Sequence, residues 1–243
     1  MLKKASTILF ITILSFSSKA EIWFDVGVKA GITTGAFINS NLLGANTQAL
    51  KFKPGYLLGG KIGINFGIKH SLTVDFITAN TSIGMHNSVT DLTNTVSITT
   101  FDLPIMYRVN QDNGGYGEIG PQFSFTTSGS STIEGVTTDD KAIFNGTNMA
   151  IAAGFGQYIG GGNTFGFTFG FRFAYTLGDI VSSDFASSGS DPVYKPHSQE
   201  EIADYSYSGT SRLYAGVVLE ANFNLGYIAK GAKCTKKTKF RLF

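Results

Sequence analysis

The stretch 162–179 reads GNTFGFTFGFRFAYTLGD and places an aromatic or large apolar side chain at every second position. Phenylalanine occupies positions 165, 167, 169, 171 and 173, and Tyr175 and Leu177 continue the spacing. The positions between them hold glycine, threonine and alanine, together with Arg172. A repeat of two residues is typical of a β-strand, whose side chains alternate between its two faces. This strand therefore has one aromatic face and one small, polar face.

The composition fits neither a disordered nor a helical chain. The 243 residues include 30 Gly, 21 Phe and 10 Tyr, and only 15% are charged, against about 25% in soluble domains. Of the 19 Lys and Arg residues, three lie in 1–20 and six in 230–243, which leaves 10 basic against 17 acidic residues in 21–229. This balance argues against nucleic acid as a partner. The single cysteine, Cys234, excludes an intrachain disulfide.

The first 20 residues predict a secretory signal peptide. Lys3 and Lys4 precede a short apolar core at 5–16, and small residues stand at Ser18 and Ala20, where a signal peptidase reads the chain. Cleavage is expected after Ala20. A retained anchor is the alternative, but the core is shorter than the about 20 residues that span a bilayer.

Alternation continues along most of the remaining chain and predicts about eight strands, each long enough to cross a membrane at a tilt. The predicted strands are 22–33, 54–67, 70–82, 95–109, 115–127, 144–159, 164–178 and 209–228. Short turns at 67–70, 110–115 and 160–163 alternate with connections at 34–53, 83–94, 128–143 and 179–208 that are expected to be long, polar loops. Short turns at one end and long loops at the other are typical of outer-membrane barrels. The sequence thus predicts an all-β, eight-stranded antiparallel up-and-down transmembrane β-barrel over residues 21–229.

Size decides which face of the strands points inward. The interior of an eight-stranded barrel is only wide enough for side chains, and the phenylalanine row of 165–173 would overfill it. The aromatic face is therefore expected to contact lipid, whereas Arg172 and its small neighbours point inward. A soluble barrel, extractable without detergent, is the alternative.

When the same alternation of outward and inward positions is applied to every strand, it predicts a set of charged side chains that point inward. They are Asp25, Lys29, Lys61, Asp75, Asp102, Arg108, Glu118, Arg172 and Glu220. Because buried charges persist only when they are paired, we expect a charge-paired network that fills the lumen. An ion or proton path along these groups is the alternative.

Four segments resemble the PorT-like outer-membrane β-barrel family, known from Bacteroidetes. They are VKAG at 28–31, FDLPIMYR at 101–108, YGEIGPQF at 116–123 and FAYTLGDI at 173–180, and they occur in the family's order. The resemblance implies a small outer-membrane barrel, similar in shape to OmpA-like proteins. It also implies contact with outer-membrane lipids and with the machinery that inserts barrels.

The C-terminal segment departs from this family pattern. Outer-membrane barrels usually end on an aromatic residue of the last strand, whereas here a basic tail, 230–243, follows that strand. The insertion signal is then expected within 223–227, or the tail has a role of its own. The tail is either solvated in the periplasm or in contact with anionic cell-wall or lipid groups.

The sequence predicts no catalytic residue, no metal site and no cofactor. The three histidines, His70, His86 and His197, occur in no HExxH or Cys/His spacing, and no phosphate-binding loop is present. His86 and His197 lie near serines and aspartates, which leaves a lipid-modifying enzyme as a minor alternative. The acidic, tyrosine-bearing loop 179–208 is predicted either to bind a partner or cations or to remain solvated.

These observations together predict a small monomeric protein of the Gram-negative outer membrane. Its expected role is structural, or that of a surface scaffold whose outer loops bind an extracellular or envelope protein. A narrow pore or transporter is the main alternative.

Overall fold

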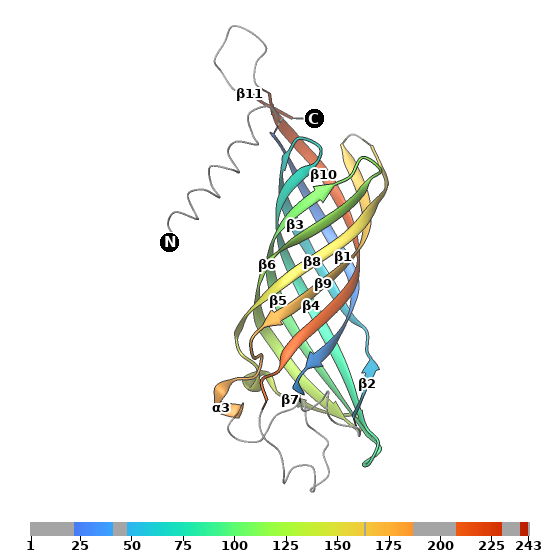
Figure 1. Cartoon of the computed structure of the whole chain (residues 1–243), viewed down its shortest axis with the longest axis vertical. Helices are drawn as coiled ribbons and strands as arrows, with labels where there is room; N and C mark the ends of the chain where they lie inside the picture. Colours follow the sequence, from blue (N-terminus) through green and yellow to red (C-terminus); the bar gives the residue numbers. More distant parts are fainter. Residues whose placement is uncertain (1–21, 41–47, 163, 187–207, 230–238, 243) are drawn as a thin grey trace.

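The computed structural model describes residues 22–40, 48–162, 164–186, 208–229 and 239–242. The predicted signal peptide and most of the basic tail lie outside these residues. Eight long strands form the wall: β1 (Ile22–Ile38), β3 (Gly55–Phe66), β4 (His70–Asn87), β5 (Leu92–Asn110), β6 (Gly115–Ile133), β8 (Thr147–Gly161), β9 (Phe165–Leu177) and β10 (Ser211–Ala229). Each pairs antiparallel with the next in this order, and β10 pairs with β1 to close the ring (Figure 1). The predicted eight-stranded up-and-down barrel is confirmed.

Short elements lie at the two ends of the barrel. They are β2 (Gln48–Phe52), β7 (Val136–Asp139), the 3-10 helix η1 (Lys141–Ile143), α3 (Ser183–Ala186) and β11 (Lys239–Leu242). The strands β2, β7 and β11 pair with β4, β6 and β10, respectively. In Figure 1, β2, β7 and α3 lie at the end opposite to β11. Within the described ranges, no helix is long and apolar enough to cross a bilayer.

The two ends differ in how the strands are joined. Short turns join β3 to β4, β5 to β6 and β8 to β9 at one end, which we call the turn end. The opposite end, which we call the loop end, carries β2, β7, η1 and α3. Gly67 and Gly114 have positive φ angles of 65° and 83° in two of the turns, a conformation that glycine adopts without strain.

The prediction of long loops at 83–94 and 128–143 is wrong for most of those residues. Strand β4 continues to Asn87 and β5 begins at Leu92, so only residues 88–91 join them. Strand β6 likewise runs on to Ile133 before it pairs with β7. The stretch 34–53 is also partly strand, because β1 extends to Ile38 and β2 begins at Gln48.

An apolar cluster explains why the strands continue toward the loop end. It consists of Phe37, Ile83, Met85, Val96, Ile98, Ile143, Phe144, Ile180 and Val181, and we call it the apolar plug. The extended strands contribute Phe37, Ile83, Met85, Val96 and Ile98 to the cluster, and the segments that follow β7 and β9 contribute the other four side chains. The sequence-based boundaries stopped where the outward residues became polar, although the inward apolar alternation continued past that point.

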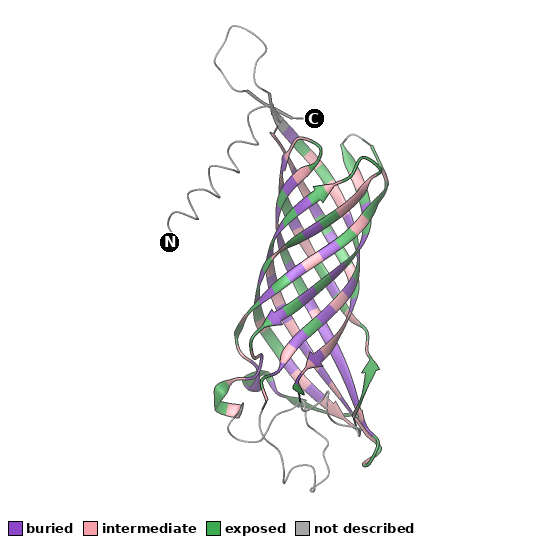
Figure 2. Cartoon of the chain, viewed as in Figure 1, coloured by how far each residue is buried: buried purple, intermediate pink, exposed green. Residues whose placement is uncertain are grey.

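Burial alternates along the wall strands as the sequence predicts (Figure 2). On β9 the phenylalanines at 165–173 are 37–46% exposed, whereas Arg172 is 2% exposed. Neighbouring rings contact one another on this outer surface, with centroids 5.4 Å apart for Phe155 and Phe171. The outer face therefore presents an apolar, aromatic belt, and the interior receives the small and charged side chains.

We predict that Phe169→Arg strongly impairs insertion of the barrel. An arginine on the lipid face near the midplane costs about 2–4 kcal/mol. The measurement is the free energy of unfolding of the protein folded into lipid vesicles. Phe52→Arg is the matched control, because Phe52 is 71% exposed on β2 at the loop end and the cost falls to about 0–1 kcal/mol near the membrane interface. Equal effects of the two changes would contradict the assigned facing.

Candidate functional site

The lumen at mid-height is filled by charged side chains. All nine residues predicted to point inward do so, and none is more than 8% exposed: Asp25, Lys29, Lys61, Asp75, Asp102, Arg108, Glu118, Arg172 and Glu220. They come from seven of the eight wall strands, and only β8 contributes none. Period-two alternation points each of them at the barrel axis, so charges far apart in the sequence can contact one another in the lumen.

Six of these side chains form a closed ring of alternating charge, which we call the ion-pair ring. Its members, in the order in which they contact one another, are Glu220, Lys29, Asp75, Arg172, Glu118 and Arg108, and the contacts Asp75–Arg172 and Arg108–Glu220 cross the lumen. Lys29 Nζ lies 3.1 Å from Glu220 Oε2 and 2.7 Å from Asp75 Oδ2. Arg172 Nη2 then donates to Asp75 Oδ2 at 2.6 Å.

The other half of the ring is built on Arg108. Its Nε and Nη2 donate to Glu118 Oε2 at 2.9 and 2.7 Å, and its Nη1 donates to Glu220 Oε1 at 3.0 Å. Glu118 Oε1 accepts from Arg172 Nη2 at 3.2 Å, which completes the ring. Charge-assisted bonds of this kind are stronger than neutral hydrogen bonds.

A branch extends the ring toward the turn end. Lys61 Nζ lies 2.8 Å from Glu220 Oε1 and 3.6 Å from Asp25 Oδ2. Asn65 Nδ2 donates to Asp25 Oδ2 at 3.2 Å, and Asn222 Nδ2 donates to Glu220 Oε1 at 2.7 Å. Ring and branch together hold four basic and four acidic side chains, so they carry no formal net charge.

A glycine on β8 leaves room for the ring. Gly154 pairs with Glu118 on one side and with Arg172 on the other. A Cβ atom at this position would lie 3.0 Å from Glu118 Oε1 and 3.0 Å from the backbone oxygen of Phe171. Strand β8, which supplies no charge, therefore leaves space for the side chain of Glu118.

Asp102 is the one predicted lumen residue that is not joined to the others. It is fully buried, and neither of its carboxylate oxygens has a hydrogen-bond partner among the described residues. Arg212, which the site prediction omitted, is also buried, with Cζ 5.8 Å from the centroid of the Tyr214 ring. The alternation along β10 already placed Arg212 on the inward face, so its inward position could have been predicted from the sequence.

The apolar plug closes the lumen on the loop-end side of these charges. Phe144 and Val181 form an isolated antiparallel bridge, and the Ser182 N–H donates to the Ile143 carbonyl at 2.8 Å. Asn145 Nδ2 donates to the backbone oxygen of Asp179 at 2.8 Å. These bonds tie two loop segments together over the barrel mouth.

His70 and His86 lie outside the lumen network. His70 Nδ1 is 2.8 Å from the Tyr107 hydroxyl, and His86 Nδ1 is 3.1 Å from Thr93 Oγ1 with Asp91 Oδ1 3.7 Å from its Nε2. Within the ranges that the structure describes, no group of three or more His, Cys, Asp or Glu side chains could hold a metal ion. The third histidine, at position 197, lies outside those ranges.

The acidic loop predicted at 179–208 is described only at its two ends. Asp179 Oδ1 accepts from the backbone N–H groups of Val181 and Thr210 at 2.9 and 3.1 Å. This aspartate therefore fastens the base of the connection. Most of the acidic and tyrosine residues of the loop lie in 187–207, outside the described residues.

A family model described as "Outer membrane protein beta-barrel domain" matches residues 16–182. The chain belongs to this family. The protein is therefore a β-barrel of the Gram-negative outer membrane, and its aromatic belt faces lipid. In such barrels short turns are periplasmic and longer loops extracellular, which places the turn end in the periplasm and the loop end at the cell surface.

Solved structures of small outer-membrane proteins resemble this outer-membrane barrel at low identity. Neisserial surface protein A (NspA) is 11% identical, with a TM-score of 0.41 and coverage of 82% of this chain and 96% of that protein. Ail of Yersinia pestis, in complex with the heparin analogue sucrose octasulfate, is 9% identical, with a TM-score of 0.40 and coverage of 83% and 99%. OprG of Pseudomonas aeruginosa is 11% identical, with a TM-score of 0.36 and coverage of 86% and 98%. A search of curated proteins gives no significant match.

We predict that Arg172→Leu destabilises this outer-membrane barrel by about 3–5 kcal/mol, because it leaves the buried carboxylates of Asp75 and Glu118 short of a partner. The measurement is urea unfolding of the protein in lipid vesicles. Lys69→Leu is the control, since Lys69 makes an exposed pair with Asp112 at 3.4 Å, and such pairs contribute about 0–1 kcal/mol. An unchanged unfolding midpoint for Arg172→Leu would count against a structural role for the ring.

Proposed function

We propose that the protein is a non-conducting, monomeric scaffold of the outer membrane. In this proposal a barrel with a filled lumen holds loop-end hairpins at the cell surface, where they bind an extracellular or envelope protein. The observation that carries the proposal is the presence of two barriers in series, the ion-pair ring at mid-height and the apolar plug at the loop end.

The ring argues against the alternative of a narrow pore or transporter. An ion that crossed this level would have to displace partners that are buried and already paired, such as Lys29 and Asp75 at 2.7 Å. The side chains of the apolar plug beyond it are hydrophobic, so they cannot replace the water that an ion loses there. An eight-stranded wall has little space to open a second route.

The loop end supports the binding part of the proposal. The hairpin of β4 and β5 and the hairpin of β6 and β7 lie at the loop end (Figure 1). Val136 on β7 is 70% exposed and Phe52 on β2 is 71% exposed. Loops and hairpins held by a rigid scaffold often carry recognition residues, which supports the binding role that we propose for this end.

We also infer that the resemblance to PorT-like barrels is meaningful, because three of its segments supply ring members. The segment 28–31 contains Lys29, 101–108 contains Arg108 and 116–123 contains Glu118. Arg108 and Glu118 stand directly opposite each other in the register of β5 and β6. We propose that the barrel wall contacts outer-membrane lipids and that the chain is recognised by the barrel-insertion machinery.

A lipid-modifying enzyme, the remaining alternative, would need a nucleophile activated by a nearby base. His86 is bonded to Thr93 near the tip of the β4–β5 hairpin, and His197 lies outside the described residues. We therefore propose no catalytic role for His86.

The test is the conductance of the purified protein in a planar lipid bilayer. We expect no open-state current, because the ring and the plug both close the lumen, while a porin reconstituted in parallel conducts. Steady current steps that follow the amount of folded barrel would overturn the scaffold proposal in favour of the pore.

A further inference from the structure

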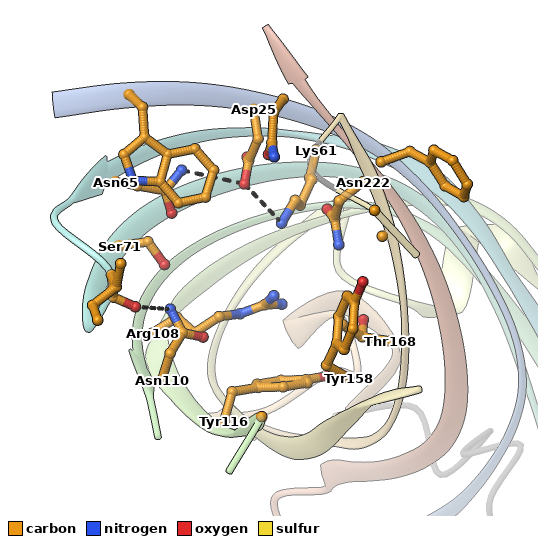
Figure 3. Close-up of a pocket in the computed structure, with 17 residues that line it drawn as sticks. Asp25, Lys61, Asn65, Ser71, Arg108, Asn110, Tyr116, Tyr158, Thr168 and Asn222 are labelled. Atoms are coloured by element: carbon orange, nitrogen blue, oxygen red, sulfur yellow. Dashed lines mark hydrogen bonds and ion pairs between the residues drawn. The ribbon is translucent and has the colours of Figure 1, made fainter. Parts of the chain in front are cut away.

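The turn end of the lumen is hollow, in contrast to the loop end. A cavity of about 300 Å³ lies between the ion-pair ring and the periplasmic turns, and we call it the turn-end cavity (Figure 3). Ile68, Gly114 and Gly162, from three different turns, line it at the mouth. Its size is at the lower end of the about 300–1,000 Å³ typical of ligand pockets, which suits a solute of one sugar ring rather than a polymer.

At the floor of the turn-end cavity, two basic side chains face the hollow, and their acidic partners lie behind them. Lys61 and Arg108 line the cavity, whereas their carboxylate partners Glu220 and Glu118 do not. Figure 3 shows both basic side chains pointing into the centre of the hollow. Asp25 is the acidic residue of the lining, and its Oδ2 contacts Lys61 and Asn65, whereas its Oδ1 has no hydrogen-bond partner among the described residues. The lining therefore carries two basic side chains against one acidic side chain, which favours an anion in the cavity.

The walls of the turn-end cavity combine aromatic rings with amides and hydroxyls. Trp23, Tyr116 and Tyr158 contribute rings, and the Arg108 guanidinium lies 4.1 Å from the centroid of the Tyr116 ring. Asn222 and three further asparagines contribute amides. Aromatic faces pack against the C–H faces of a sugar, while amides and hydroxyls bond to its hydroxyl groups.

We propose that the turn-end cavity binds a small carboxylated sugar from the periplasm. The carboxylate would lie against Lys61 and Arg108, and the ring would stack between the aromatic walls. Because the ring and the plug close the far side, the solute enters and leaves through the periplasmic mouth only. The barrel would thus carry a binding site that opens only toward the periplasm, in addition to its surface role.

The test uses Trp23, the single tryptophan of the chain, which lines the cavity. Its fluorescence in the detergent-solubilised, folded barrel is titrated with N-acetylmuramic acid and with N-acetylglucosamine, which lacks the carboxylate-bearing group. We expect a saturable change with the acid and at least tenfold weaker binding of the neutral sugar. Equal binding of the two sugars, or no saturable change with either, would overturn the proposal.

Two glycine variants localise the binding. Gly162→Phe adds a ring at the mouth, where a Cβ atom meets nothing within 4 Å, and we expect at least a tenfold loss of affinity for N-acetylmuramic acid. Gly117→Phe is the matched control, since Gly117 is exposed on the outer face of β6, has equal space and does not line the cavity. We expect it to bind as the wild type does. Both variants are first checked for the heat-modifiable electrophoretic mobility of a folded barrel. Full binding by Gly162→Phe, or equal loss in both folded variants, would overturn the assignment to this cavity.

Discussion

The pairing of charges inside a narrow lumen is the constraint on which the rest of this structure depends. Eight strands enclose a space that holds side chains and little else, so a charge that points inward must find a counter-charge there. The ion-pair ring meets this requirement with side chains from six strands, including Lys29 of β1 and Glu220 of β10, which stand opposite each other where the barrel closes. A shift of register by one residue would turn such a charge toward lipid. We interpret the ring as a device that fixes register more than as a source of net stability.

The aromatic outer surface and the small inward residues both follow from the narrow lumen and the paired charges inside it. Because charges and glycines fill the interior, the bulky rings of β9 remain for the lipid face, where hydrocarbon accepts them. Gly154 illustrates the coupling, since its missing side chain leaves the space into which Glu118 reaches. The two ends of the lumen then differ in chemistry: apolar side chains close the cell-surface end, and a polar cavity opens toward the periplasm.

Much of this arrangement could be predicted from the sequence, because a period of two identifies a strand and its two faces, and the narrow interior decides which face points inward. On β9, the outward facing of the phenylalanine row placed Arg172 inside. The same alternation, applied to the other strands, placed eight further charges inside. Alternation does not specify which charges meet, because that depends on strand tilt and side-chain reach, so the isolation of Asp102 was not foreseen. The alternation also gave the wrong strand ends at the loop end. There the strands leave lipid and their outward residues become polar, while Ile83 and Val96 remain buried inside. The turn-end cavity is formed by residues from many strands and turns, and no local pattern reveals it.

The most direct measurement of the central claim is a double-mutant cycle on Lys29 and Glu220 in the barrel folded into lipid vesicles. Lys29→Met, Glu220→Gln and the double variant are unfolded in urea, and the coupling free energy is obtained from the four unfolding free energies. If the lumen depends on paired charges, the two changes are coupled by about 0.5–3 kcal/mol, as is typical of residues in one network. Additivity within about 0.3–0.5 kcal/mol would show that the two side chains act independently and would contradict the account.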